Sequence, residues 1–163
     1  MHAEPRREHQ WLQQLVGEWE YETEMDAGPG KPRQKFVGAE TIRAIGNLWV
    51  VCEAVGQAPG VSDNVRMIIT LGFDPQKNRF VGTWIGSMMT FMWLYDGALD
   101  ASGRTLILDC EGPGFTDQTK MAKYQDRITI EGDDRRTLAA RTQQGPGGEW
   151  IEFMVTRYRR RRT

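Results

Sequence analysis

The sequence has few of the residues on which enzyme and metal chemistry usually depend. Its 163 residues contain only two histidines and two cysteines. His2 and His9 both lie in the N-terminal segment, so the rest of the chain has no imidazole to act as a general base or to complete a Ser-His-Asp triad. Cys52 and Cys110 stand alone and no predicted strand contains a histidine, which excludes the usual clustered zinc site and a His-ligated haem. We therefore expect no metal and no cofactor, and we predict no catalytic residue.

The net charge is close to zero, and long apolar runs are absent from the sequence. The chain has 21 Lys and Arg residues against 22 Asp and Glu, a formal net charge of -1, so no electrostatic attraction to nucleic acid is implied. No stretch approaches the ~18 consecutive apolar residues of a membrane helix, and we expect no membrane insertion. Residues 1–8 are polar and lack the apolar core of a signal peptide. This favours a cytoplasmic protein with reduced cysteines.

Glycine, tryptophan and methionine are abundant instead, with 18, 6 and 8 residues. Glycines together with closely spaced turn signals are typical of β structure. Tryptophan and methionine favour a large and adaptable apolar interior. The length fits a single domain, residues 1–163, which can bury a sizeable core without metals or disulfides.

One helix is predicted, over residues 5–16. Its apolar residues Trp11, Leu12, Leu15 and Val16 fall on one stripe, and Gly17 then ends the helix. The period changes from 3.6 to 2 directly afterwards. Residues 18–26 alternate five acids with larger apolar or hydroxyl side chains, which indicates a strand with one face on a core and one face in water.

The remainder of the chain predicts short strands separated by turn residues. These strands cover residues 34–44, 48–57, 65–73, 79–86, 89–99, 104–111, 120–131, 135–143 and 149–158. No gap is long enough for the helical crossover that parallel strands need. The short connections favour an up-and-down meander that closes on itself, because closure removes the exposed edges. The predicted fold is therefore all-β, a closed antiparallel barrel of about ten strands whose interior can hold one small ligand.

Several segments resemble known families. Residues 15–19 (LVGEW), a short helix that runs into Gly-x-Trp, resemble the opening of the calycins, the superfamily of the lipocalins and the fatty-acid-binding proteins. Together with further segments they are similar to a bacterial family known as the 1579 domain of unknown function. Those segments are residues 71–75 (LGFDP), 80–85 (FVGTWI), 88–90 (MMT), 94–97 (LYDG) and 157–160 (RYRR). The resemblance covers nearly the whole chain and implies a lipocalin-like barrel, with no established activity.

The resemblance also implies how one end of the barrel is closed. In calycins the Trp of this motif plugs one end and is often covered by an Arg of the last strand. Trp19 would then be the plug and Arg157 or Arg159 its cover, an arrangement that contributes about 0.5 to 2 kcal/mol. Since the first and last strands of a closed barrel are neighbours, the outward acids of residues 18–24 should face outward arginines of the last strand. We expect the rest of the basic C-terminal end, residues 157–163, to be solvated.

The main functional hypothesis is that the barrel binds a small lipophilic molecule in a cavity of several hundred Å³. The residues predicted to line this cavity are Tyr21, Met67, Ile69, Trp84, Met88, Met92 and Tyr124. Glu53 and Arg141 are possible polar anchors for the ligand. Strand alternation places Glu53 outside; in the opposite register it becomes a buried acid with a raised pKa. The alternation leaves the direction of Arg141 open.

Two other functions remain open at the level of sequence. The barrel could be an isomerase or hydrolase for a hydrophobic substrate, which would need a buried acid such as Glu53 or Asp126 close to a tyrosine. Alternatively, the protein could be a homo-oligomeric interaction protein. Residues 89–95 are apolar on both faces of their predicted strand, so a second cover, and with it a homodimer, is possible.

Overall fold

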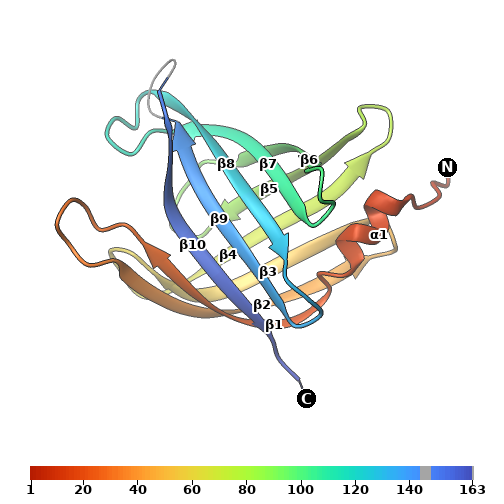
Figure 1. Cartoon of the computed structure of the whole chain (residues 1–163), viewed down its shortest axis with the longest axis horizontal. Coiled ribbons are helices and arrows are strands. Elements are labelled where there is room, and N and C mark those ends of the chain that lie inside the picture. The colour runs from red at the N-terminus through yellow and green to blue at the C-terminus, as the bar shows by residue number, and fades with distance from the viewer. Residues whose placement is uncertain (144–147, 163) are drawn as a thin grey trace.

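Ten antiparallel strands close into one barrel in the computed structural model, as the sequence predicts (Figure 1). The structure describes residues 1–143 and 148–162. Its elements are α1 (Arg7–Gln13), β1 (Gly17–Met25), β2 (Gln34–Ile45), β3 (Trp49–Ala58), β4 (Val61–Asp74), β5 (Arg79–Gly86), β6 (Trp93–Leu99), β7 (Thr105–Pro113), β8 (Met121–Ile130), β9 (Arg135–Gln143) and β10 (Trp150–Arg160). Each strand pairs with the next one along the chain, and β1 pairs with β10 to complete the circle.

The helix α1 is shorter than the predicted residues 5–16. It begins after Arg6, whose backbone is extended, and it ends at Gln13. The backbone N–H groups of Leu15 and Val16 donate to the carbonyls three residues earlier, at 3.1 and 3.2 Å. The chain therefore tightens into i→i+3 turns before β1, which is a common way for a helix to end.

The main difference among the strands concerns residues 87–92. The sequence predicted a strand over 89–99, whereas β6 begins only at Trp93. Residues 87–92 form the connection from β5, which is tied to β4 by the Ser87 N–H donating to the Arg66 carbonyl at 2.8 Å. Met88, Met89 and Phe91 of this connection line the cavity, which explains why the segment is apolar although it is not a strand. The prediction of a strand with two apolar faces was therefore wrong for this segment.

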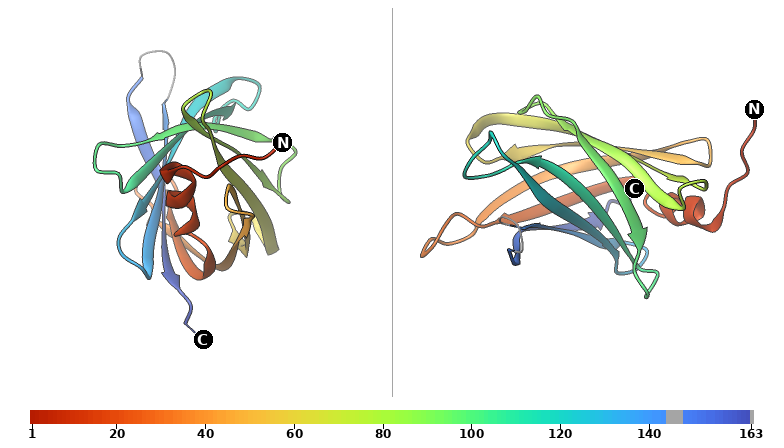
Figure 2. Two further views of the ribbon diagram at one scale, coloured as in Figure 1. Left: turned by 90° about the vertical axis from the view of Figure 1, so that its right-hand side faces the viewer. Right: turned by 90° about the horizontal axis from the view of Figure 1, so that it is seen from above.

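The two ends of the barrel are built differently. At one end α1 lies across the opening, next to the turns that connect β2 to β3 and β4 to β5 (Figures 1 and 2). The side chains of Leu12, Leu15 and Trp19 are almost completely buried there, and the Trp11 indole N–H donates to the Gly103 carbonyl at 2.8 Å. His9 anchors the helix further, because its Nε2 lies 3.0 Å from the Phe73 carbonyl. This end is closed, and the described part of the chain places no helix at the opposite end.

The outward acids of β1 face the arginines at the end of the chain, as the sequence predicted. Glu24 lies 3.5 Å from Arg157, and Glu20 lies 3.0 Å from Arg161. These pairs are exposed and contribute little individually, but they match the charges of the two strands that close the barrel. Within the described residues, no helix has the length and apolar character required to cross a lipid bilayer.

Candidate functional site

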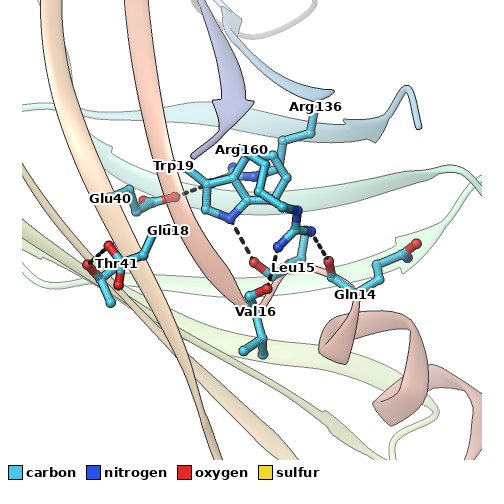
Figure 3. Close-up of polar contacts among 9 residues, drawn as sticks. All are labelled: Gln14, Leu15, Val16, Glu18, Trp19, Glu40, Thr41, Arg136 and Arg160. Carbon is cyan, nitrogen blue, oxygen red and sulfur yellow. Dashed lines mark hydrogen bonds and ion pairs between the residues drawn. The ribbon is translucent and has the colours of Figure 1, made fainter. Parts of the chain in front are cut away.

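The closed end of the barrel is organised around the indole of Trp19. The Trp19 N–H donates to the Leu15 carbonyl at 2.9 Å, and the Arg160 guanidinium lies 4.2 Å from the centroid of the indole ring (Figure 3). Arg160 is the inward residue of β10 that pairs with Trp19. The expected cover, Arg157 or Arg159, was therefore wrong, since both residues have the outward parity of the strand.

A buried ion pair lies on the inner side of this plug. Arg136 of β9 donates to the carboxylate of Glu40 of β2, and both side chains are at most 5% exposed. The Arg136 guanidinium is also held between two rings, 3.5 Å from the Tyr158 centroid and 4.6 Å from the Trp19 centroid. The neighbouring carboxylate of Glu40 raises the pKa of Arg136 despite its burial. The ion pair and the two rings therefore hold the Arg136 guanidinium in place, although its Nε has no hydrogen-bond partner among the described residues.

Beyond this floor the barrel contains a cavity of about 530 Å³ that extends to the open end. Its walls are mainly aromatic, aliphatic and methionine side chains. Among the predicted lining residues, the structure brings six together around it: Tyr21, Met67, Ile69, Trp84, Met88 and Tyr124. Met89 and Phe91 of the connection between β5 and β6 also line it, together with Phe115 and Phe153.

Tyr21 shows how the sequence makes room for this cavity. The hydroxyl end of its ring lies close to the backbone of β2 and β3, where a Cβ atom on Gly38 or Gly56 would come within 2.3 Å of the hydroxyl oxygen. Only glycine fits at these two positions without moving the ring. The hydroxyl is buried and has no hydrogen-bond partner in the described part of the chain. Burial, with the nearby charge of Glu40, raises the pKa of Tyr21 to about 12.

Asp126 and Tyr95 form a second polar pair in the wall. The Tyr95 hydroxyl donates to the Asp126 carboxylate at 2.6 Å, and both residues line the cavity. On its own sheet Asp126 is flanked by Leu108 of β7 and Ala140 of β9. Burial among these groups raises the pKa of Asp126 to about 6, although the hydrogen bond from Tyr95 acts in the opposite direction. The pKa of Tyr95 is also raised, by burial and by the Asp126 charge.

The two expected polar anchors do not reach the cavity. Glu53 lies on the outer face of β3, where Arg43 donates to its carboxylate and Arg66 lies 3.7 Å away. The hydrogen bond and charge of Arg43 lower the pKa of Glu53, so the hypothesis of a buried acid at this position was wrong. Arg141 also faces outward: its Nε donates to Gln125 at 2.7 Å, and its guanidinium stacks on Trp150.

Met92 was predicted to line the cavity but lies outside it with Leu94, whereas Trp93 and Tyr95 face the cavity. Met92 borders a groove of about 680 Å³ on the outer surface, between the loop before β6 and residues of the strands β6 to β10. Leu94, Met121 and Trp150 line the same groove, and Met92 and Leu94 are 53% and 65% exposed. This surface corresponds to the segment expected to bind a second copy of the chain, and that use of it stays a prediction.

Sequence reasoning missed the buried pair Glu40 and Arg136, although strand alternation contained the signal. Glu40 shares its parity with the inward Ile42, and Arg136 shares its parity with the inward Leu138. In residues 1–143 and 148–162, no three His, Cys, Asp or Glu side chains are grouped so that they could hold a metal ion. The cysteines Cys52 and Cys110 are free thiols.

The sequence matches the model of a protein family of unknown function, DUF1579, over residues 4–160. The chain belongs to the DUF1579 family. No curated protein matches the sequence.

Solved structures with the same barrel are known at low sequence identity. Rv2717c from M. tuberculosis superposes on this DUF1579 chain with a TM-score of 0.66 at 12% identity, over 98% of this chain and 100% of that one. The S-type phycobiliprotein lyase CPES from Guillardia theta gives a TM-score of 0.60 at 13% identity, over 98% and 99% of the two chains. At such identities the similarity establishes the fold alone.

Proposed function

We propose that this DUF1579 barrel binds a small, mainly apolar molecule in its interior. The observation that carries the proposal is the cavity of about 530 Å³, open at one end and closed at the other by Trp19. This volume lies within the ~300–1,000 Å³ range of small-molecule sites, and the wall combines apolar side chains with few polar groups, as such sites do. Barrels of eight to ten strands are wide enough to hold one ligand of this kind.

Burial of apolar surface supplies the energy of binding in this proposal. A ligand that buries about 300 Å² of apolar surface gains roughly 7 kcal/mol at 25 cal/mol per Å², before the loss of translational and rotational freedom is subtracted. The methionines Met67, Met88 and Met89 can adapt to ligands of different shape. A protein with the same fold, the S-type phycobiliprotein lyase, is named for an activity on phycobiliproteins.

Native mass spectrometry of the protein mixed with prodan, a neutral and weakly polar dye, tests the proposal. We expect one dye per chain at saturation, and a rise and blue shift of the dye fluorescence as it leaves water. Freshly purified protein is measured first without dye, because a mass that is lost on denaturation would identify a ligand already bound. The absence of any specific 1:1 complex with the dye contradicts the proposal.

A second candidate function, general acid–base catalysis on a hydrophobic substrate, is favoured by the pair of Asp126 and Tyr95. The acid faces the cavity beside a tyrosine, and its pKa of about 6 suits proton transfer near neutral pH. An NMR titration of the side-chain carboxyl carbons, with Asp126→Asn to assign the signal, tests this candidate. If every carboxyl group titrates at an ordinary pKa, its support is removed.

A further inference from the structure

The ionisable groups around the cavity are unbalanced in charge. Two carboxylates line it, those of Glu40 and Asp126. Among the residues that the structure describes, no lysine, arginine or histidine is part of the wall. The polar character of the cavity therefore comes from carboxylates, hydroxyls, a thiol and the neutral side-chain amides of Gln57 and Gln118, and none of these groups carries a positive charge.

Of the two carboxylates, Glu40 already has a cationic partner, Arg136. Arg136 donates to it from behind the cavity wall, and the guanidinium is fixed between the rings of Trp19 and Tyr158. Arg136 is itself buried and is not part of the cavity wall, and displacement of Glu40 from the buried ion pair by a ligand carboxylate would be strongly unfavourable. The buried arginine of this barrel is consequently not available as an anchor for an acidic ligand.

Asp126 is different, because its charge has no cationic partner in the described residues. Among residues 1–143 and 148–162, Tyr95 is the only side chain that donates a hydrogen bond to Asp126, through its hydroxyl at 2.6 Å. A carboxylate has about four acceptor sites, so Asp126 retains the capacity to accept further hydrogen bonds. Its surroundings on the sheet are apolar, and an unpaired charge in such surroundings gains strongly from a partner.

We propose that the cavity takes amphiphilic ligands whose polar end is a hydrogen-bond donor or a cation, such as a primary amine, with that end at Asp126, and that it rejects alkyl carboxylates of the same length. The inference rests on the ligand-binding function proposed above and names its ligand class. An ammonium group would complete the ion pair that Asp126 lacks. A carboxylate would instead place a second negative charge beside Asp126 in a site of low polarity, without a cation to compensate it.

Competition against prodan separates these ligand classes. Decylamine, decan-1-ol and decanoate share one chain length and differ only in the polar end, so they are compared at pH 7.5 below their micelle concentrations. We expect the amine to displace the dye at least tenfold more tightly than decanoate does, with the alcohol between the two. In Asp126→Asn the preference for amine over decanoate should fall to less than threefold. Asp109→Asn is the matched control, because Asp109 lies on the neighbouring strand and borders the outer groove.

Each result decides a different claim. If neither prodan nor decanol binds, the ligand-binding function itself fails. If both bind but decanoate competes as well as decylamine, the interior binds ligands and the proposed selectivity is overturned. If the preference for the amine survives in Asp126→Asn, or is lost equally in Asp109→Asn, the assignment to Asp126 is overturned. Thermal melts of the two variants confirm that each is folded during the comparison.

Discussion

The guanidinium of Arg160 is stacked over the indole of Trp19, 4.2 Å from the ring centroid. The same group donates to the carbonyls of Val16 and Gln14 at 2.6 and 2.9 Å, and its Nε donates to the Asp133 carbonyl at 2.8 Å. One side chain at the end of β10 thus holds the connection from α1 to β1. Gly17 allows this approach, because a Cβ there would meet the guanidinium at 2.3 Å. The plug is held by contacts between the two ends of the chain.

Substitution of Arg160 should therefore destabilise the protein more than substitution of its neighbours. We expect Arg160→Leu to lower the free energy of unfolding by about 2 kcal/mol, from lost charge-assisted hydrogen bonds and the lost stacking on Trp19. Arg159→Leu is the control, because Arg159 is exposed and points away from Trp19; its effect should stay within about 0.5 kcal/mol. Urea unfolding measures both, and equal losses would contradict the role given to Arg160.

The ion pair between Glu40 and Arg136 should show strong coupling in a double-mutant cycle. Arg136→Met leaves a buried carboxylate without its partner, and we expect a loss of about 3 to 5 kcal/mol of stability. Glu40→Leu should cost a similar amount, because it leaves the Arg136 charge buried. The double variant should recover most of the loss, since it removes both charges. If the two single losses simply add, the residues are not paired as the structure describes.

The alternation of residues along each strand made most of the barrel predictable. It placed Trp19 and Tyr21 inside and the acids of β1 outside, and it gave the right bounds for β5 and β9. It failed where no strand exists, over residues 87–92, because apolar residues at a barrel mouth look like a buried strand. It also gave the wrong parity for the residue of β10 that covers Trp19: Arg157 or Arg159 was expected, whereas Arg160 pairs with Trp19.

The cavity itself was harder to predict than the barrel. Its volume depends on where each inward side chain lies, and Tyr21 leaves space only because Gly38 and Gly56 accept its ring. The pair of Asp126 and Tyr95 joins strands that are not neighbours, so no pairing rule brings the two residues together. Sequence alternation left the direction of Tyr95 open, because residues 89–95 are apolar on both faces; only the three-dimensional fold shows that Tyr95 faces the cavity and meets Asp126.

Asp126 should reduce the stability of the ligand-free protein above pH 6. Its pKa rises from an ordinary value of 3.8 to about 6 on folding, so the folded state binds the proton more tightly than the unfolded state. The stabilising effect of that proton is complete below the unfolded pKa and is lost as the pH rises through about 6. We therefore expect Asp126→Asn to be more stable than the natural protein at pH 7.5, by up to about 3 kcal/mol.

Urea unfolding of the two proteins between pH 4 and 8 checks this expectation. The stability difference should be small near pH 4 and should widen until about pH 7. The side-chain amide in Asp126→Asn keeps an oxygen that can accept the hydrogen bond from Tyr95, so the variant isolates the effect of the charge. A constant difference across this range would mean that the pKa of Asp126 is not raised.

Binding of decylamine should weaken as Asp126 becomes protonated. The titratable groups whose charge is coupled to Asp126 are the Tyr95 hydroxyl and the Cys110 thiol. Both have raised pKa values and remain neutral over this range, so the carboxyl group governs the response. We expect the dissociation constant of decylamine to rise as the pH falls below about 6, by up to tenfold per pH unit, whereas that of decanol stays constant. Parallel curves for the two ligands would contradict a contact between the amine and Asp126.

The most direct test of ligand binding inside the barrel is a substitution that places a large side chain in the cavity. Ala140 of β9 lines the cavity, whereas the adjacent Ala139 has the outward parity of the same strand. Prodan titrations of Ala140→Phe and Ala139→Phe compare the same change in volume on the two faces. We predict that Ala140→Phe, while still folded, loses at least tenfold in affinity and that Ala139→Phe binds like the natural protein. Equal binding by both variants would place the dye outside the barrel and contradict the account.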